Sequence, residues 1–310
     1  MAKAKKALVL LNMGAARSKD ELEVFLTNMF NDKNILTIQN NTIRSMLASL
    51  IVTLRLNKAW DNYKQIGGQS PLHDFTDLLV KKLQVALPEY YITTAMRYTS
   101  IFAQTAIAKI KQEKIKDVVL LPLYPHYSTT TTKSSVEDFI EKANDEFTIT
   151  TIEPFYKNET YNKAICDEII RVQAKYNDYH LIFSAHGLPQ KIVKKGDPYQ
   201  KQVEEHVELL KEKLSHYATN IKSINLAYQS KVGPMKWLSP SLNDMLKHFK
   251  NEKVIIYPIS FIVDNSETVF ELDIEYREIA EKLKLRDYKV CSCVNDSDTF
   301  VEALKEIVSL

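Results

Sequence analysis

The chain has 310 residues, which is long enough for one large domain or two medium domains with real cores. Lysine and arginine number 41 against 39 aspartate and glutamate residues, so no excess of positive charge indicates a nucleic-acid partner. The three cysteines have neither CxxC nor zinc-binding spacing, which argues against a disulfide scaffold or a cysteine-ligated cluster. Residues 7–11 are too short for a signal-peptide core, and no apolar stretch approaches the ~20 residues needed to span a bilayer. We therefore expect a cytoplasmic protein.

Strand and helix patterns alternate along the chain, and the same order occurs twice. The strands expected from apolar runs are residues 7–11, 92–96, 118–123, 180–186, 224–228 and 254–259. The helices expected between them include residues 71–87, 135–147, 199–217 and 239–249. This alternation predicts an α/β fold with two doubly wound, Rossmann-like parallel-sheet halves facing across a cleft. We place the domains at residues 1–157 and 158–310.

The segment 180–189, HLIFSAHGLP, is the most informative part of the sequence. An apolar strand leads to His186, and the glycine and proline that follow end the strand there. His186 should therefore lie at the carboxyl edge of a sheet, where open α/β sheets bind ligands. A histidine there can accept a proton or bind a metal, although one held by hydrogen bonds in a loop is the alternative.

A second group of polar residues follows the strand expected at 254–259. Asp264, Asn265 and Ser266 can cap a helix that opens with Glu267. Glu267, Glu271 and Glu275 are spaced by four residues, which places three carboxylates on one helical face. Either this is a solvated face, or it carries cations or protons toward a pocket shared with the imidazole. An imidazole and a carboxylate together suit a divalent cation.

Seven segments in order resemble the signature segments of ferrochelatase and extend over nearly the entire chain. They are 11–14 (LNMG), 66–71 (IGGQSP), 97–98 (RY), 121–128 (LPLYPHYS), 183–189 (FSAHGLP), 229–238 (QSKVGPMKWL) and 266–276 with SET and ELDIEY. The resemblance implies a type II chelatase fold and a lyase of haem biosynthesis that inserts Fe²⁺ into protoporphyrin IX, releasing two protons. Iron insertion into coproporphyrin III, another tetrapyrrole chelatase, and a non-catalytic tetrapyrrole carrier are the alternatives.

The resemblance also assigns roles to individual residues. It implies that His186 and Glu267 handle metal and protons from opposite faces of the macrocycle, and that Asp264, Glu271 and Glu275 form an acidic path. Positions implied to contact the porphyrin are Met13, Arg55, Ser70, Arg97, Tyr124, Ser128, Thr130 and Trp237. Arg55 and Ser70 match positions near the propionates, where a guanidinium is an apt partner for a carboxylate. For Met13 and Trp237, core packing is the alternative.

Residues 43–60 have apolar side chains at helical spacing, which is typical of a helix packed on a core. In the family context this helix, with Phe30, Ile35 and Leu36, forms the lip of the porphyrin pocket and is expected to touch a membrane surface.

Three departures from the family pattern refine these expectations. Asn265 stands where many relatives have histidine, so a proton relay through that side chain is not implied. Met13 stands where coproporphyrin enzymes tend to carry tyrosine, which favours protoporphyrin. The chain ends at Leu310 without a cysteine-bearing extension, so we expect no [2Fe–2S] cluster and no cofactor beyond the substrate Fe²⁺. The sequence leaves the oligomeric state open.

Overall fold

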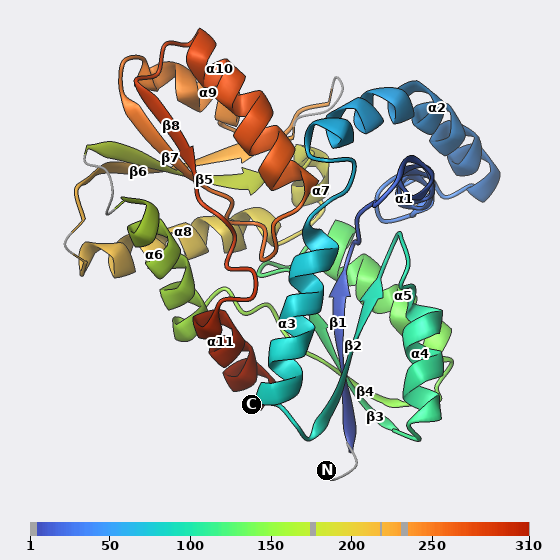
Figure 1. The fold of residues 1–310 in the computed structure, drawn as a ribbon. Coiled ribbons are helices and arrows are strands. Elements are labelled where there is room, and N and C mark those ends of the chain that lie inside the picture. Colours follow the sequence, from blue (N-terminus) through green and yellow to red (C-terminus); the bar gives the residue numbers. More distant parts are fainter. Residues whose placement is uncertain (1–4, 174–177, 218, 231–234, 310) are drawn as a thin grey trace. The chain divides into compact units, whose positions relative to one another are not determined.

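The computed structural model describes residues 5–173, 178–217, 219–230 and 235–309. The chain forms two compact units, one made of Met1–Tyr124, Ser128–Pro154 and Val308–Leu310, and the other of Pro125–Tyr127 and Phe155–Ile307. Each unit contains a four-stranded parallel sheet with helices packed on it (Figure 1). Among the described residues, no helix is both long enough and apolar enough to cross a membrane.

The sheet of the first unit has the strand order β2-β1-β3-β4. Its strands are β1 (Lys6–Asn12), β2 (Tyr90–Met96), β3 (Asp117–Pro122) and β4 (Thr148–Thr151). Its helices are α1 (Lys19–Asn31), α2 (Asn41–Gln65), α3 (Leu72–Ala86), α4 (Ala103–Gln112), the π-helix η1 (Thr129–Lys133) and α5 (Ser134–Ala143). Figure 1 shows α3 over one face of this sheet and α4 with α5 over the other.

Side chains along each buried strand point alternately to the two faces of the sheet, which explains why helices cover both faces. Val9 and Leu11 of β1 and Leu120 of β3 point to one face, where they pack with Ile107 of α4 and Phe139 of α5. All five side chains are almost completely buried. Burial of each such side chain stabilises the fold by about 1.5–3 kcal/mol before conformational entropy is subtracted.

The second unit repeats this topology with the order β6-β5-β7-β8. Its strands are β5 (Tyr179–His186), β6 (Ile221–Gln229), β7 (Lys253–Tyr257) and β8 (Asp287–Val290). Its helical elements are α6 (Glu159–Gln173), α7 (Gln190–Lys194), α8 (Tyr199–Ser215), α9 (Leu242–Leu246), the 3₁₀ turn η2 (Lys247–Phe249), the π-helix η3 (Glu267–Glu275), α10 (Tyr276–Lys282) and α11 (Asp298–Ser309). Ile182, Ala227 and Ile256 of the strands pack with Leu246 and Leu272 on one face.

The matching strand orders confirm the predicted internal repeat and the two parallel sheets. The prediction missed one strand in each half, β4 and β8, which are four-residue strands at the sheet edges. Both are short and partly exposed, with the sequences TITT and DYKV, so neither has the continuous apolar run of a buried strand.

Three predicted helices differ in detail from the observed elements. The helix expected at 135–147 ends at Ala143, where Asn144 adopts the left-handed conformation. The helix expected at 239–249 begins only at Leu242, because Ser241 is its N-cap and accepts a hydrogen bond from the Asp244 backbone N–H (3.1 Å). The helix expected to open with Glu267 does begin there, but its first nine residues form a π-helix.

Candidate functional site

His186 is the last residue of β5, at the carboxyl edge of the second sheet as predicted. Its backbone is held on both sides: its N–H donates to Ser260 Oγ (3.1 Å), and its carbonyl accepts from the Tyr199 hydroxyl (2.9 Å). Ser260 and Tyr199 are themselves hydrogen-bonded at 2.6 Å. The imidazole therefore projects from a rigid strand end instead of a free loop.

A glycine follows His186 because the structure has no room for a side chain at position 187. Its N–H donates to the Gln229 carbonyl of β6 (2.9 Å), and a Cβ at this position would lie 2.6 Å from that oxygen. The next turn brings Trp237 close, since a Gly187 Cβ would lie 3.4 Å from the indole and Pro189 forms a β-bridge with Trp237. Trp237 is half-buried beside the His186 loop. Residues 231–234 of the same predicted segment lie outside the described residues.

The central contact of the site joins His186 to Glu267. The imidazole Nδ1 lies 2.8 Å from Glu267 Oε2, and the two side chains are 37% and 36% exposed. Burial disfavours the charged forms of both groups, but their mutual attraction and hydrogen bond outweigh it, so the pKa of His186 is raised and that of Glu267 lowered. The pair is therefore an imidazole–carboxylate unit in which Glu267 orients the ring.

This contact confirms one expectation and contradicts another. The imidazole and the carboxylate do share one edge of the same sheet, as the strand order requires. The expectation that they act from opposite faces of the macrocycle is wrong, because two groups 2.8 Å apart leave no space for a ring between them.

Ser230 connects Glu267 to the next carboxylate of the helix. Its hydroxyl lies 2.6 Å from Glu271 Oε2 and 3.2 Å from Glu267 Oε2, and its backbone N–H donates to Glu271 Oε1 (2.8 Å). Burial and the nearby charge of Glu267 raise the pKa of Glu271 to about 7, even though the Ser230 hydrogen bond opposes this rise. Ser230 was not among the residues expected at the site, because it lies in a signature segment without a chemical pattern of its own.

The three predicted carboxylates differ in exposure along η3. Glu267 and Glu271 are half-buried, whereas Glu275 is exposed. The π-helical geometry is seen in the Tyr276 N–H, which donates to the carbonyl of Glu271, five residues back. Short π-helical segments are frequent at functional sites, so this one is a second indication that η3 has a role beyond packing.

Asp264, the remaining acidic candidate, is buried and already satisfied by its neighbours. Its carboxylate accepts hydrogen bonds from the Thr268 hydroxyl (2.8 Å), the Asn295 side-chain amide (2.7 Å) and the Cys293 N–H (3.3 Å). Asn265 Oδ1 accepts from the Glu267 N–H (2.8 Å). Asn265 thus caps the start of η3 as predicted, whereas Asp264 holds the helix only through the Thr268 hydroxyl and Ser266 makes no side-chain cap hydrogen bond.

Most of the remaining candidates lie at the carboxyl edge of the first sheet. Met13 follows β1, Arg97 follows β2, and Tyr124 lies two residues after β3. The Tyr124 hydroxyl lies 3.0 Å from Ser135 Oγ. Ser128 Oγ lies 2.9 Å from Thr130 Oγ1 at the start of η1.

Arg97, Ser70 and Arg55 differ greatly in their surroundings. The Arg97 guanidinium is 21% exposed and forms ion pairs with Asp32 (2.9 Å) and Asp138 (3.0 Å). Ser70 is buried, and its N–H donates to the Ala16 carbonyl (3.0 Å). Arg55 is exposed on α2 and lies over the ring of Phe30, 5.9 Å from its centroid.

Comparison with known sequences identifies the family of this chain. The ferrochelatase family model matches residues 5–310. The chain belongs to the ferrochelatase family. Curated ferrochelatases of a Nitratiruptor species and of Sulfurimonas denitrificans are 50% and 49% identical to it, with at least 97% of each chain covered. A ferrochelatase of Helicobacter pylori is 42% identical over 98% of this chain and 93% of the relative.

Two solved structures share the fold of this chain. SirB from Bacillus subtilis with Fe³⁺ has a TM-score of 0.60 at 11% identity, covering 98% of this chain and 94% of that one. The sirohydrochlorin chelatase SirB from Bacillus subtilis subspecies spizizenii, in complex with cobalt, gives 0.59 at 10% identity with the same coverage. At such identities the likeness concerns the fold, and it confirms the expected chelatase architecture. Family membership confirms the expected lyase that inserts Fe²⁺ into a porphyrin in haem biosynthesis.

Proposed function

We propose that this chain inserts Fe²⁺ into protoporphyrin IX and that His186 and Glu267 handle both the metal and the two pyrrole protons. The observation that carries the proposal is the 2.8 Å contact between His186 Nδ1 and Glu267 at a sheet edge. With Nδ1–H donated to a carboxylate, Nε2 on the other side of the ring is the more basic nitrogen. It can accept a proton from a pyrrole nitrogen or bind Fe²⁺ as the ion loses water.

The protons leave, in this proposal, along the carboxylates of η3. Metallation releases two pyrrole protons, so the site must pass on one proton before it accepts the second. Glu267, Ser230 and Glu271 form a continuous line of hydrogen-bonding groups, and exposed Glu275 follows on the same helix. A pKa of about 7 suits Glu271 to accept and release a proton near neutral pH. Asp264 belongs to this acidic path as an anchor, since it holds the start of η3.

We assign porphyrin binding mainly to residues 1–157 and the metal and proton chemistry to residues 158–310. The candidates in the first group gather at the carboxyl edge of their sheet, the edge at which open α/β sheets bind ligands. Arg55 and Ser70 are assigned to the propionates. The side chains assigned to the macrocycle are Met13, Arg97, Tyr124, Ser128, Thr130 and Trp237.

The choice of protoporphyrin IX depends on Met13. Coproporphyrin III carries four propionates, and an apolar side chain at the end of β1 offers the two extra charges no partner, which makes their burial costly. The test is an anaerobic assay of the purified protein with Fe²⁺ and each porphyrin. Higher kcat/KM for protoporphyrin IX supports the proposal, and a clear preference for coproporphyrin III contradicts it. Porphyrin binding without any metallation would instead indicate a carrier.

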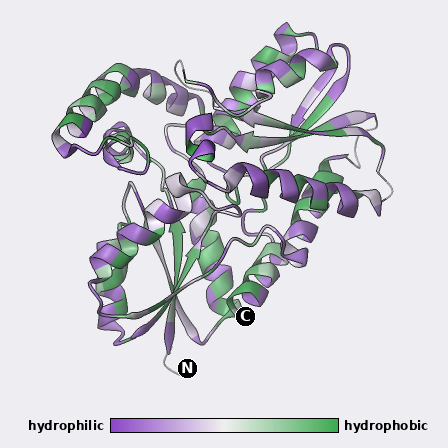
Figure 2. Cartoon of the chain, turned by 180° about the vertical axis from the view of Figure 1, so that it is seen from behind, coloured by the Kyte–Doolittle hydropathy of each residue, from purple (hydrophilic) through white to green (hydrophobic). Residues whose placement is uncertain are grey.

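We further propose that the lip contacts a membrane surface. The lip consists of residues 30–36, which include Phe30, Ile35 and Leu36, and of α2. Hydrophobic residues recur along α2 (Figure 2), and four of them at helical spacing are strongly exposed. They are Ile43 (56%), Met46 (69%), Leu50 (56%) and Leu54 (73%). An exposed apolar stripe on a helix that also carries arginine and lysine suits adsorption to an anionic bilayer.

A further inference from the structure

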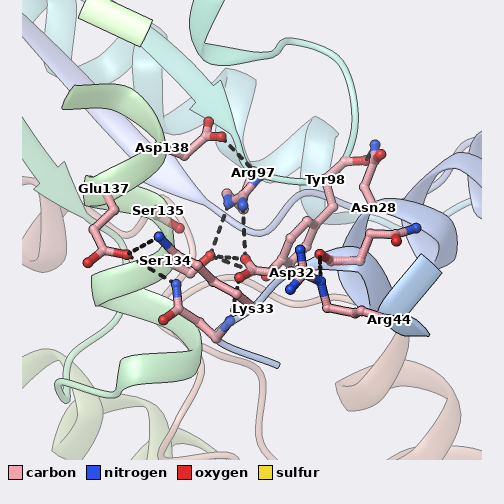
Figure 3. Close-up of polar contacts among 12 residues, drawn as sticks. Asn28, Asp32, Lys33, Arg44, Arg97, Tyr98, Ser134, Ser135, Glu137 and Asp138 are labelled. Carbon is pink, nitrogen blue, oxygen red and sulfur yellow. Dashed lines mark hydrogen bonds and ion pairs between the residues drawn. The ribbon is translucent and has the colours of Figure 1, made fainter. Parts of the chain in front are cut away.

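A buried aspartate, Asp32, joins three separate segments of the first unit (Figure 3). Its side chain is 1% exposed and lies just after α1. Its Oδ2 atom accepts hydrogen bonds from the Tyr98 hydroxyl (2.9 Å) and from Ser134 Oγ, and pairs with the Arg97 guanidinium at 2.9 Å. Arg97 and Tyr98 follow β2, whereas Ser134 begins α5, so one carboxylate oxygen ties the end of α1 to the sheet and to α5.

The same residue closes the turn that follows it. Asp32 Oδ1 accepts from the Asn34 N–H (2.7 Å), and its carbonyl accepts from the N–H groups of Ile35 (3.0 Å) and Leu36 (2.9 Å). Both donors on the carbonyl are lip residues. The position of residues 30–36 relative to the sheet edge therefore depends on Asp32 through side-chain and backbone contacts together.

The second carboxylate that pairs with Arg97 lies outside the lip turn. Asp138 of α5 pairs with Arg97 Nη1 (3.0 Å) and with Lys142 (2.8 Å), and its side chain is 10% exposed. Loss of the Asp32 charge would therefore leave Arg97 with a carboxylate partner. Two aspartates thus hold the same guanidinium, and only the fully buried one, Asp32, belongs to the lip turn.

We propose that Asp32 is a positioning residue that fixes residues 30–36 over the porphyrin site and so determines porphyrin affinity. It contacts no substrate in this proposal and acts through the backbone it holds. In Asp32→Asn, the single amide oxygen can accept from the three donors on Oδ2 or from the Asn34 N–H on Oδ1, but not from both, because an amide nitrogen accepts no hydrogen bond. We expect the lip turn to loosen while the sheet keeps its own packing. The proposal rests on the proposed function, because the lip matters only where a porphyrin binds.

The experiment compares Asp32→Asn with Asp138→Asn, a matched control that removes the other charge from Arg97. For Asp32→Asn we expect the KM for protoporphyrin IX to rise about tenfold, with kcat within about threefold and the KM for Fe²⁺ unchanged. For Asp138→Asn we expect the porphyrin KM to stay within about twofold. Amide hydrogen exchange of residues 34–36 should accelerate in the first variant only.

Two results would overturn this role: equal increases of the porphyrin KM in both variants, or an Asp32→Asn protein with unchanged KM and unchanged exchange. If Asp32→Asn fails to fold, Tyr98→Phe removes one donor while keeping the charge. It should raise the porphyrin KM about threefold and accelerate the same amides, and an unchanged exchange pattern would count against the proposal. Amide hydrogen exchange can be measured without turnover. A wild-type protein that fails to metallate the porphyrin would therefore contradict the proposed function, while the exchange data would still test the role of Asp32.

Discussion

Replacement of Glu271 by glutamine should change how the stability of the protein depends on pH. The pKa of this carboxyl is about 7 in the fold, against an ordinary value of 4.5. Between these values the unfolded chain has lost the proton while the folded chain still holds it, so the free energy of unfolding falls as pH rises from about 5 to 7. Above about 7 both states are ionised and the loss is complete. Glutamine, which cannot ionise, removes this loss.

The size of the effect follows from the shift. At about 1.4 kcal/mol per pKa unit, the difference between about 7 and 4.5 sets an upper limit of about 3 kcal/mol. Part of it arises from burial and part from repulsion by Glu267, and the Ser230 hydrogen bonds reduce it. Loss of these charge-assisted bonds in the variant lowers its stability at every pH, so the pH dependence is the informative quantity.

The assay is urea unfolding of both proteins at several pH values from about 5 to 8. The stability of Glu271→Gln minus that of the wild type should increase across this range by about 1–3 kcal/mol. Other titrating groups largely cancel in the difference. Glu275→Gln, which removes the next and exposed carboxylate of the same helix, should give a much smaller increase, because Glu275 makes only the smallest contribution to the raised pKa of Glu271. A flat difference for Glu271→Gln would refute the conclusion that this carboxyl is buried and repelled by Glu267.

Four further predictions concern activity and binding. His186→Ala should lower kcat by at least about 100-fold while porphyrin binding, followed by absorbance, persists; near-normal turnover would exclude it from the mechanism. Ser230→Ala should raise the pKa of Glu271 further, because the hydrogen bond that lowers it is lost, and shift the kcat–pH profile to higher pH; an unshifted profile would argue against the link. Arg55→Leu should raise the porphyrin KM by roughly 10- to 100-fold with little change in kcat, since a charge-assisted hydrogen bond is worth about 1.5–3 kcal/mol. Leu54→Asn, which removes apolar surface without adding charge, should weaken sedimentation with anionic vesicles roughly tenfold without loss of activity in solution, and unchanged sedimentation would contradict the membrane contact.

The fold was largely predictable because its central strands are buried on both faces. Such strands are continuous apolar runs, and β1, β5 and β7 each end at a proline, a glycine or a polar residue that marks the carboxyl edge. The same logic placed His186 correctly. Strands β4 and β8 were missed because each has only four residues, several of them polar and partly exposed. The π-helical geometry was missed because four-residue spacing fits both helix types.

The contacts that organise the site could not be predicted from local pattern. Ser230 and Glu271 are 41 residues apart, and Asp32 and Ser134 are 102 residues apart. Neither pair shares an element, so no periodicity links them. The expected placement of His186 and Glu267 on opposite ring faces failed for a related reason: the chemistry requires a base and a carboxylate but does not fix the distance between them.

The observed hydrogen-bond contacts determine which groups of the site can hold a proton. A serine hydroxyl has one proton to donate, yet Ser230 Oγ lies within reach of two carboxylates. The pKa of Glu267 is lowered by His186, so Glu267 stays ionised at rest and accepts the Ser230 hydrogen bond. Glu271, with its pKa near 7, can donate a hydrogen bond to Ser230 Oγ when protonated and accept one from it when ionised. Near neutral pH this chain of groups holds its extra proton about half of the time. It can therefore take up one pyrrole proton and release it toward Glu275 before the second arrives.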